Sequence, residues 1–97
     1  MPNYITLMRY SQKGIETIKD SPKRADAAKK LFESLGGKMK AIYLTMGHYD
    51  LVVISEFPND ETAAKALLTT GSQGNVHTQT LRAFTEDEYH KLIASLP

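Results

Sequence analysis

The chain has 97 residues, of which 41% are hydrophobic and 24% are charged, a composition typical of one globular domain and not of a disordered segment. Twelve basic and eleven acidic side chains leave a formal net charge of +1, so charge indicates neither a nucleic acid nor an anionic membrane as a partner. Cysteine is absent, which excludes disulfides, thiolate metal sites and a cysteine nucleophile.

Length and hydrophobic patterning also bear on location and assembly. No segment approaches the ~20 consecutive apolar residues that span a bilayer, and the first residues do not resemble a secretory signal. We therefore expect a cytoplasmic protein with one domain, residues 1–97. Because a core this small leaves much surface exposed, self-association is favoured.

The first third of the chain predicts a strand followed by a helix. Residues 4–10 are rich in β-branched and aromatic side chains, which favour a strand. Ile15 and Ile18 begin a helical stripe that is interrupted at Ser21, a predicted N-cap, and Pro22, which suits a first helical turn. The stripe continues with Ala25, Ala28, Phe32 and Leu35. Two glycines, Gly36 and Gly37, then end the helix.

The middle third predicts a hairpin with strands at residues 39–45 and 49–57. Residues 46–48 join them, and Gly47 is suited to a positive φ. Residues 51–54 are apolar without alternation, which predicts that both faces of this strand are covered. Since helices cover one face of a two-layer domain, we expect a second copy of the chain on the other face.

The last third predicts a helix, an edge strand and a terminal helix. The first helix follows a turn at residues 58–61 and ends at residues 71–74, and the threonine-rich residues 76–83 form the strand. A capping box at residues 85–88 begins the terminal helix, which we expect to dock through its apolar stripe. The predicted stripes are Ala63, Ala64, Leu67 and Leu68 in the first helix, and Tyr89, Leu92, Ile93 and Leu96 in the second.

The order of these elements is β-α-β-β-α-β followed by a helix. Two crossover units around a hairpin predict an α+β, ferredoxin-like split βαβ fold with a four-stranded antiparallel sheet.

Asp50 is the most informative polar residue, because a carboxylate at the start of an apolar central strand is costly unless it is hydrogen-bonded. One interpretation is that it accepts backbone N–H groups of the turn, together with Gly47 as a turn-structuring pair. The alternative is that it faces a pocket at the strand end and contacts a ligand.

At this hairpin the chain resembles the GYD domain family, because Gly47, Tyr49 and Asp50 match the Gly-Tyr-Asp motif. The resemblance extends from Tyr4 to Tyr89 and includes further blocks at residues 19–24, 44–47, 74–76 and 80–85. It implies a dimeric α+β barrel, in which two ferredoxin-like sheets meet face to face, and no established activity.

A more distant resemblance is to the effector domain of Lrp/AsnC-type regulators. It rests on Thr45, Gly47, Tyr49 and Asp50 before an apolar strand, on residues 58–60, which open a helix, and on the block at residues 74–76 with threonines after it. That family implies an amino acid bound between subunits near the hairpin. The helix-turn-helix that precedes such domains is absent here, so the resemblance does not imply DNA binding.

Polar side chains at alternate positions of three strands are candidates for a cavity between two sheets. They are Tyr4, Thr6 and Tyr10 in the first strand, Tyr43 and Thr45 in the second, and Thr78, Thr80 and Arg82 in the fourth. Arg82 is the best candidate for an anion contact, with a surface salt bridge as the alternative. The predicted ligand-binding residues are Tyr10, Tyr43, Thr45, His48, Tyr49, Asp50, Thr80 and Arg82.

The three histidines are scattered, and none has a second ligand two or four residues away, so we predict no metal site and no cofactor. His48 is interpreted as a turn residue that acts as a base only if the hairpin tip lines a pocket. The basic residues of the 23–30 helix interleave with acidic ones, which indicates a solvated face and not a nucleic-acid site.

The favoured function is a homo-oligomeric module that binds a small anionic or amino-acid-like metabolite between subunits. Two alternatives remain: a cofactor-independent monooxygenase or isomerase of the dimeric α+β barrel type, and a purely structural oligomer. No catalytic triad, paired carboxylates or metal motif supports the enzyme.

Overall fold

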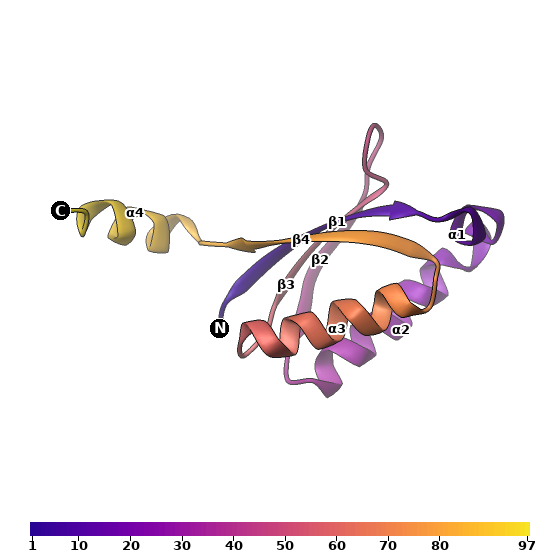
Figure 1. Ribbon diagram of the computed structural model, residues 1–97, viewed down its shortest axis with the longest axis horizontal. Coiled ribbons are helices and arrows are strands. Elements are labelled where there is room, and N and C mark those ends of the chain that lie inside the picture. Colours follow the sequence, from indigo (N-terminus) through magenta and orange to yellow (C-terminus); the bar gives the residue numbers. More distant parts are fainter.

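The computed structural model describes all residues, 1–97, and has the predicted ferredoxin-like order of elements (Figure 1). The strands are β1 (Asn3–Tyr10), β2 (Lys38–Leu44), β3 (Leu51–Glu56) and β4 (Val76–Ala83). The helices are α1 (Gln12–Glu16), α2 (Ser21–Ser34), α3 (Asp60–Ser72) and α4 (Glu86–Ala94), with a 3-10 turn, η1 (Ile18–Asp20), before α2.

The four strands form one antiparallel sheet in the order β2-β3-β1-β4, so β3 and β1 are central and β4 is an edge strand, as predicted. Helices α2 and α3 lie on one side of this sheet (Figure 1). We call the opposite side the outer face. Since two helices cover a single face, the sheet has one face packed and one open.

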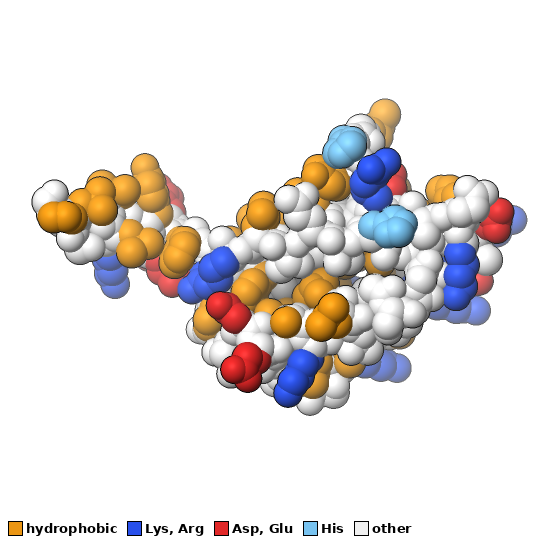
Figure 2. Space-filling model, in the orientation of Figure 1, with side chains coloured by type: hydrophobic (Ala, Val, Ile, Leu, Met, Phe, Trp, Pro, Cys, Tyr) orange, Lys and Arg blue, Asp and Glu red, His pale blue; other side chains and the backbone are white.

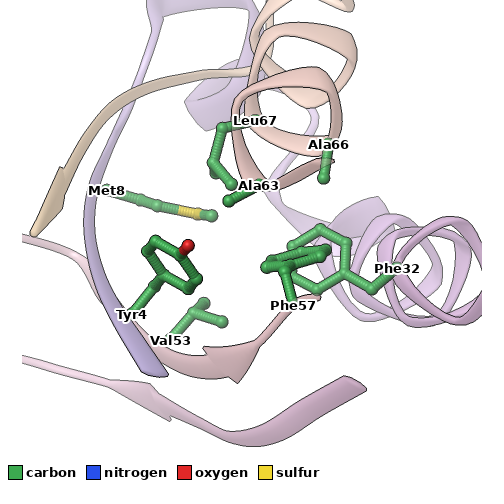
Figure 3. Packing of buried hydrophobic residues seen from close by; sticks show 8 residues of the cluster. All are labelled: Tyr4, Met8, Phe32, Val53, Phe57, Ala63, Ala66 and Leu67. Atoms are coloured by element: carbon green, nitrogen blue, oxygen red, sulfur yellow. The ribbon is translucent and has the colours of Figure 1, made fainter. Parts of the chain in front are cut away.

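The core lies between the sheet and these two helices. Figure 3 shows Tyr4, Met8 and Val53 of the sheet pointing toward Ala63, Ala66 and Leu67 of α3, with Phe32 of α2 and Phe57 beside them. The rings of Phe32 and Phe57 lie 5.0 Å apart between centroids. A Cβ on Gly37 would clash with the Phe57 ring, so the chain needs a glycine there to enter β2.

Two predictions about the helices are wrong in detail. Leu68 is 74% exposed, and Ala66 is buried in its place, because the face of α3 toward the core is rotated relative to the predicted stripe. Ser21 is the first residue of α2 and does not cap it; its hydroxyl instead lies 2.8 Å from the hydroxyl of Tyr10. Pro22 does lie in the first turn, as predicted.

The terminal helix α4 does not pack on its own domain. It continues the direction of β4 and projects away from the sheet at the end opposite to α1, which makes the molecule 51 Å long (Figure 1). The predicted capping box is present, with Thr85 Oγ1 accepting from the Glu88 N–H and a Glu88 carboxylate oxygen accepting from the Thr85 N–H at 2.9 Å. The expectation that the apolar stripe docks is wrong within one chain: Tyr89, Leu92, Ile93 and Leu96 are all about half exposed or more.

Candidate functional site

The outer face of the sheet is apolar and open. Strand register places Ile5 and Leu7 of β1 beside Val52 and Ile54 of β3, and Leu81 of β4 beside Ile5. The alternate residue Val53 is fully buried on the helix side. In the run 51–54, one set of side chains therefore faces the helices and the other faces outward, and the covering of the outward set by a second copy stays a prediction.

The loop that joins β2 to β3, residues 45–50, rises from the sheet on the side away from the helices (Figure 1). It is a six-residue loop, longer than the three residues predicted, because the Thr45 N–H donates to the Asp50 carbonyl at 2.8 Å and Thr45 Oγ1 donates to the Tyr49 carbonyl at 2.6 Å. Gly47 has a φ of +115°, the positive value that its position predicted. Tyr49 Oη donates to Gln79 Oε1 of β4 at 3.0 Å.

Asp50 terminates the pairing of β3 with β1. Its Oδ2 accepts from the backbone N–H of Tyr10 at 2.9 Å, and its own N–H donates to the Met8 carbonyl at 2.8 Å. The prediction that its carboxylate binds N–H groups of the turn is wrong, because the donor belongs to the neighbouring strand. The carboxylate replaces the ladder partner that β1 loses where β3 diverges into the loop.

A hollow of about 250 Å³ lies on the helix-facing side of the sheet, between β1, β4 and the start of α3. Arg82, Asp60, Tyr4 and Thr80 line it with apolar side chains of α3. The Tyr4 hydroxyl donates to Asp60 Oδ1 at 2.5 Å, and Arg82 Cζ lies 5.9 Å from the centroid of the Tyr4 ring. The Thr80 hydroxyl lies 3.0 Å from the hydroxyl of Thr6.

Arg82 and Asp60 do not neutralise each other. Their charged atoms do not come within ion-pairing distance of each other, and the one such contact of the chain joins the His90 ring to Glu86 on α4, 3.7 Å apart. Arg82 donates instead to the backbone carbonyls of Asn3, at 3.5 Å, and Ala83, and its guanidinium lies 4.4 Å from the centroid of the Phe84 ring. Two opposite charges that line one hollow without pairing can each contact a group of opposite sign on a ligand.

Tyr4 is the most perturbed titratable group of the chain. Burial, the hydrogen bond to Asp60 and the charge of that carboxylate raise the pKa of Tyr4 from 10.0 to about 12, and the nearby Arg82 charge opposes them. The phenol therefore stays protonated and keeps donating to Asp60 throughout the physiological range.

This pKa predicts a stability change at alkaline pH. The unfolded chain loses the Tyr4 proton near pH 10 and the folded chain near pH 12, so this contribution to stability is complete below pH 10 and is lost as pH rises to about 12. Tyr4→Phe should flatten the dependence of the free energy of unfolding on pH in that window, measured by urea unfolding at several pH values. Tyr89→Phe, at an exposed tyrosine, is the control. An unchanged slope in Tyr4→Phe contradicts the assignment.

A second, mostly apolar cavity of about 60 Å³ lies between α2 and the sheet. Tyr10 and Ser21, whose hydroxyls are 2.8 Å apart, line it with Arg24. Arg24 is already engaged, since it donates to the carbonyls of Thr17 and Gly14 at 3.0 and 3.1 Å. This volume accommodates water or a small apolar group but falls well below the ~300 Å³ of ordinary ligand pockets.

The structure divides the predicted ligand-binding residues among five places. Thr80 and Arg82 line the hollow, Tyr10 lines the small cavity, and Asp50 holds the end of β1. Tyr43, 58% exposed, pairs with Val52 and faces outward. The remaining three, Thr45, His48 and Tyr49, belong to the loop, where the rings of His48 and Tyr49 lie 4.8 Å apart.

The prediction that Tyr4, Thr6, Thr80 and Arg82 line a cavity between two sheets is wrong. These side chains share the face that α3 covers, as the 1% exposure of Thr6 and the register Tyr4–Arg82 show. Asp60 was not among the predicted residues, since an acidic residue in the first turn of a helix is usually explained by the helix dipole.

No group of three histidine, aspartate or glutamate side chains lies close enough to hold a metal ion. None of the helices combines the length and the apolar composition that crossing a membrane requires.

The fold is that of a ferredoxin-like α+β protein with a four-stranded antiparallel sheet, and solved structures share it. Residues 4–93 match the GYD domain, and the chain belongs to the GYD domain family. A relative from Thermus thermophilus, named glutamine synthetase and cystathionine beta-lyase binding protein, is 34% identical over 84 residues, which are 86% of this chain and 88% of the relative.

Two solved structures show the same fold at low identity. TTHA0845, also from Thermus thermophilus, is 23% identical, with a TM-score of 0.57 and coverage of 88% of this chain and 95% of its own. FFRP-DM1, an Lrp-like protein, is 17% identical, with a TM-score of 0.62 and coverage of 87% and 100%. The resemblance to the GYD domain family is therefore confirmed at the level of the family, and the more distant resemblance to Lrp-type domains is confirmed at the level of the fold.

Proposed function

We propose that this chain is a homodimeric module that binds a small amphoteric metabolite, of the amino-acid class, in the hollow lined by Arg82, Asp60 and Thr80. The observation that carries the proposal is the pair of opposite charges that line the hollow and do not pair with each other. Only Nη1 of Arg82 donates to backbone carbonyls, which leaves Nε and Nη2 to bind a carboxylate. The Asp60 carboxylate can accept from an ammonium group, and the Thr80 hydroxyl lies in the same lining.

The outer face supports the homodimer in this proposal. Its apolar side chains, Ile5, Leu7, Val52, Ile54 and Leu81, form a contiguous surface on three neighbouring strands. Such a surface is costly in water and is covered when a second sheet packs on it. Because the hollow lies on the helix-facing side, stacking of two outer faces leaves it open to solvent.

The test is a thermal-shift screen of amino acids beside analogues that lack either the carboxylate or the amino group. A ligand present at ~100 times its Kd adds ~2.7 kcal/mol to the stability of the native state. Arg82→Ala should leave the melting temperature nearly unchanged and abolish the ligand-induced shift, because Arg82 is exposed. Arg9→Ala, at an exposed arginine whose strand position places it on the outer face, is the matched control. A full shift in Arg82→Ala, or equal shifts by all analogues, contradicts the proposal.

A second candidate function is binding to another protein, which the name of the Thermus thermophilus relative supports. In that case the outer face is the docking surface and the chain is monomeric when isolated. Light scattering distinguishes the two candidates, because a homodimer at micromolar concentration has already covered this face.

A further inference from the structure

The segment from Phe84 to Pro97, which we call the arm, is well formed and lacks a partner. Its helix α4 is closed at the N-terminal end by both bonds of the capping box, and a backbone N–H of Thr85 lowers the pKa of Glu88. Its apolar side chains are nevertheless exposed to solvent, and Figure 2 shows hydrophobic side chains over much of the projecting helix. A short helix gains most of its stability from packing of an apolar face, so this face requires a surface to cover it.

The arm cannot reach the exposed apolar side chains at the far end of its own chain. Ile15 and Ile18, in α1 and η1, are 49% and 40% exposed, and they lie at the end of the 51 Å long axis opposite to α4 (Figure 1). Ile15 and Ile18 are three residues apart in the sequence. The other exposed large apolar side chains outside the sheet, the β2–β3 loop and the arm are Met1 and Leu68.

The charges of the arm are complementary to those of the end of the molecule that carries α1. The first turn of α4 carries Glu86, Asp87 and Glu88, against one lysine in its last turn. Residues 13–24, around Ile15 and Ile18, carry four basic side chains against two acidic ones. An acidic helix start on the arm is therefore complementary to the basic surface around α1 and η1.

We infer that the arm of one chain packs on the α1 end of a second copy, with Leu92 and Ile93 against Ile15 and Ile18 of the partner. A twofold axis that lies between two stacked outer faces, perpendicular to the long axis, carries the arm end of one chain onto the α1 end of the other. The contact then forms twice, and the pair is closed. This inference concerns a surface separate from the metabolite hollow and does not rest on ligand binding.

The absence of cysteine permits a direct test by cross-linking. Leu92→Cys is mixed with Ile18→Cys carrying a mass tag, and the mixture is oxidised gently. We expect a disulfide between tagged and untagged chains, because a disulfide needs Cα atoms ~4.4–6.8 Å apart. Leu68→Cys, at another exposed leucine outside the proposed contact, replaces Ile18→Cys as the matched control and should cross-link far less.

Other disulfides would overturn the inference. A Leu92→Cys to Leu92→Cys link as the main product means that two arms pair with each other. A link within one chain of the Leu92→Cys, Ile18→Cys double variant means that the arm folds back. Equal cross-linking with Leu68→Cys, or no cross-linking at all, means that the arm has no fixed contact with a second copy.

Charge reversal supplies an independent readout in the full chain. Glu86→Lys with Asp87→Lys should weaken self-association about tenfold, the effect expected of four weak exposed ion pairs, two in each of the two contacts, as measured by sedimentation. Lys19→Glu with Lys23→Glu should restore it in the combined variant. Failure of that rescue contradicts the contact. Failure of the metabolite screen leaves both tests unaffected, since neither contains a ligand.

Discussion

Val52→Asp is expected to convert the protein into monomer or aggregate while its secondary structure is kept. Val52 lies on the outer face, paired with Leu7 and Tyr43, so a carboxylate there would be buried without a partner when two sheets stack. Light scattering with detection of molar mass, at micromolar concentration, measures the result. A wild-type chain that is already monomeric there contradicts the homodimer.

The neighbouring residue provides the control for this experiment. Val53 is fully buried against the helices, so Val53→Asp should unfold the chain itself, which circular dichroism detects. The two substitutions are alike in chemistry and differ by one position along β3. A folded Val53→Asp protein, or an unfolded Val52→Asp protein, would show that the faces of the strand are assigned incorrectly.

Asp50→Ala is expected to cost ~1–3 kcal/mol of stability, because it leaves the Tyr10 N–H without an acceptor at the end of β1. Asp50→Asn should cost less, since the amide oxygen can still accept. Chemical unfolding of the two variants measures both values. If neither substitution changes stability and both abolish a ligand-induced shift, then Asp50 is a ligand contact, as the alternative interpretation held.

Local sequence determined most of the secondary structure. The glycines at 36 and 47 have the positive φ values that their positions predicted, and the capping box at Thr85 and Glu88 is formed. These features depend on a few adjacent residues, whose conformational preferences act before any tertiary contact. The loop length after Thr45 was underestimated because its closing bonds involve a tyrosine carbonyl and Asp50, which carry no distinctive local pattern.

The candidate site depended on information that one strand does not contain. Alternation placed Thr80 and Arg82 on one face of β4, but which face α3 covers follows from the crossover connection and the sheet order β2-β3-β1-β4. Asp60 reaches Tyr4 although 56 residues separate them in sequence. Long-range pairs of this kind arise from packing, so the hollow was not predicted.

The sequence by itself determined the fold class, the family and the two-faced nature of β3, because hydrophobic periodicity and turn chemistry are local properties. The tertiary structure alone decided that Val52 and not Val53 faces outward, that Arg82 and Asp60 line one hollow, and that α4 projects from the body. An amphipathic stripe shows that a helix has a partner, but it carries no information about whether that partner belongs to the same chain. Docking depends on the path of the connecting residues, and here Phe84 and Thr85 continue β4 away from the core.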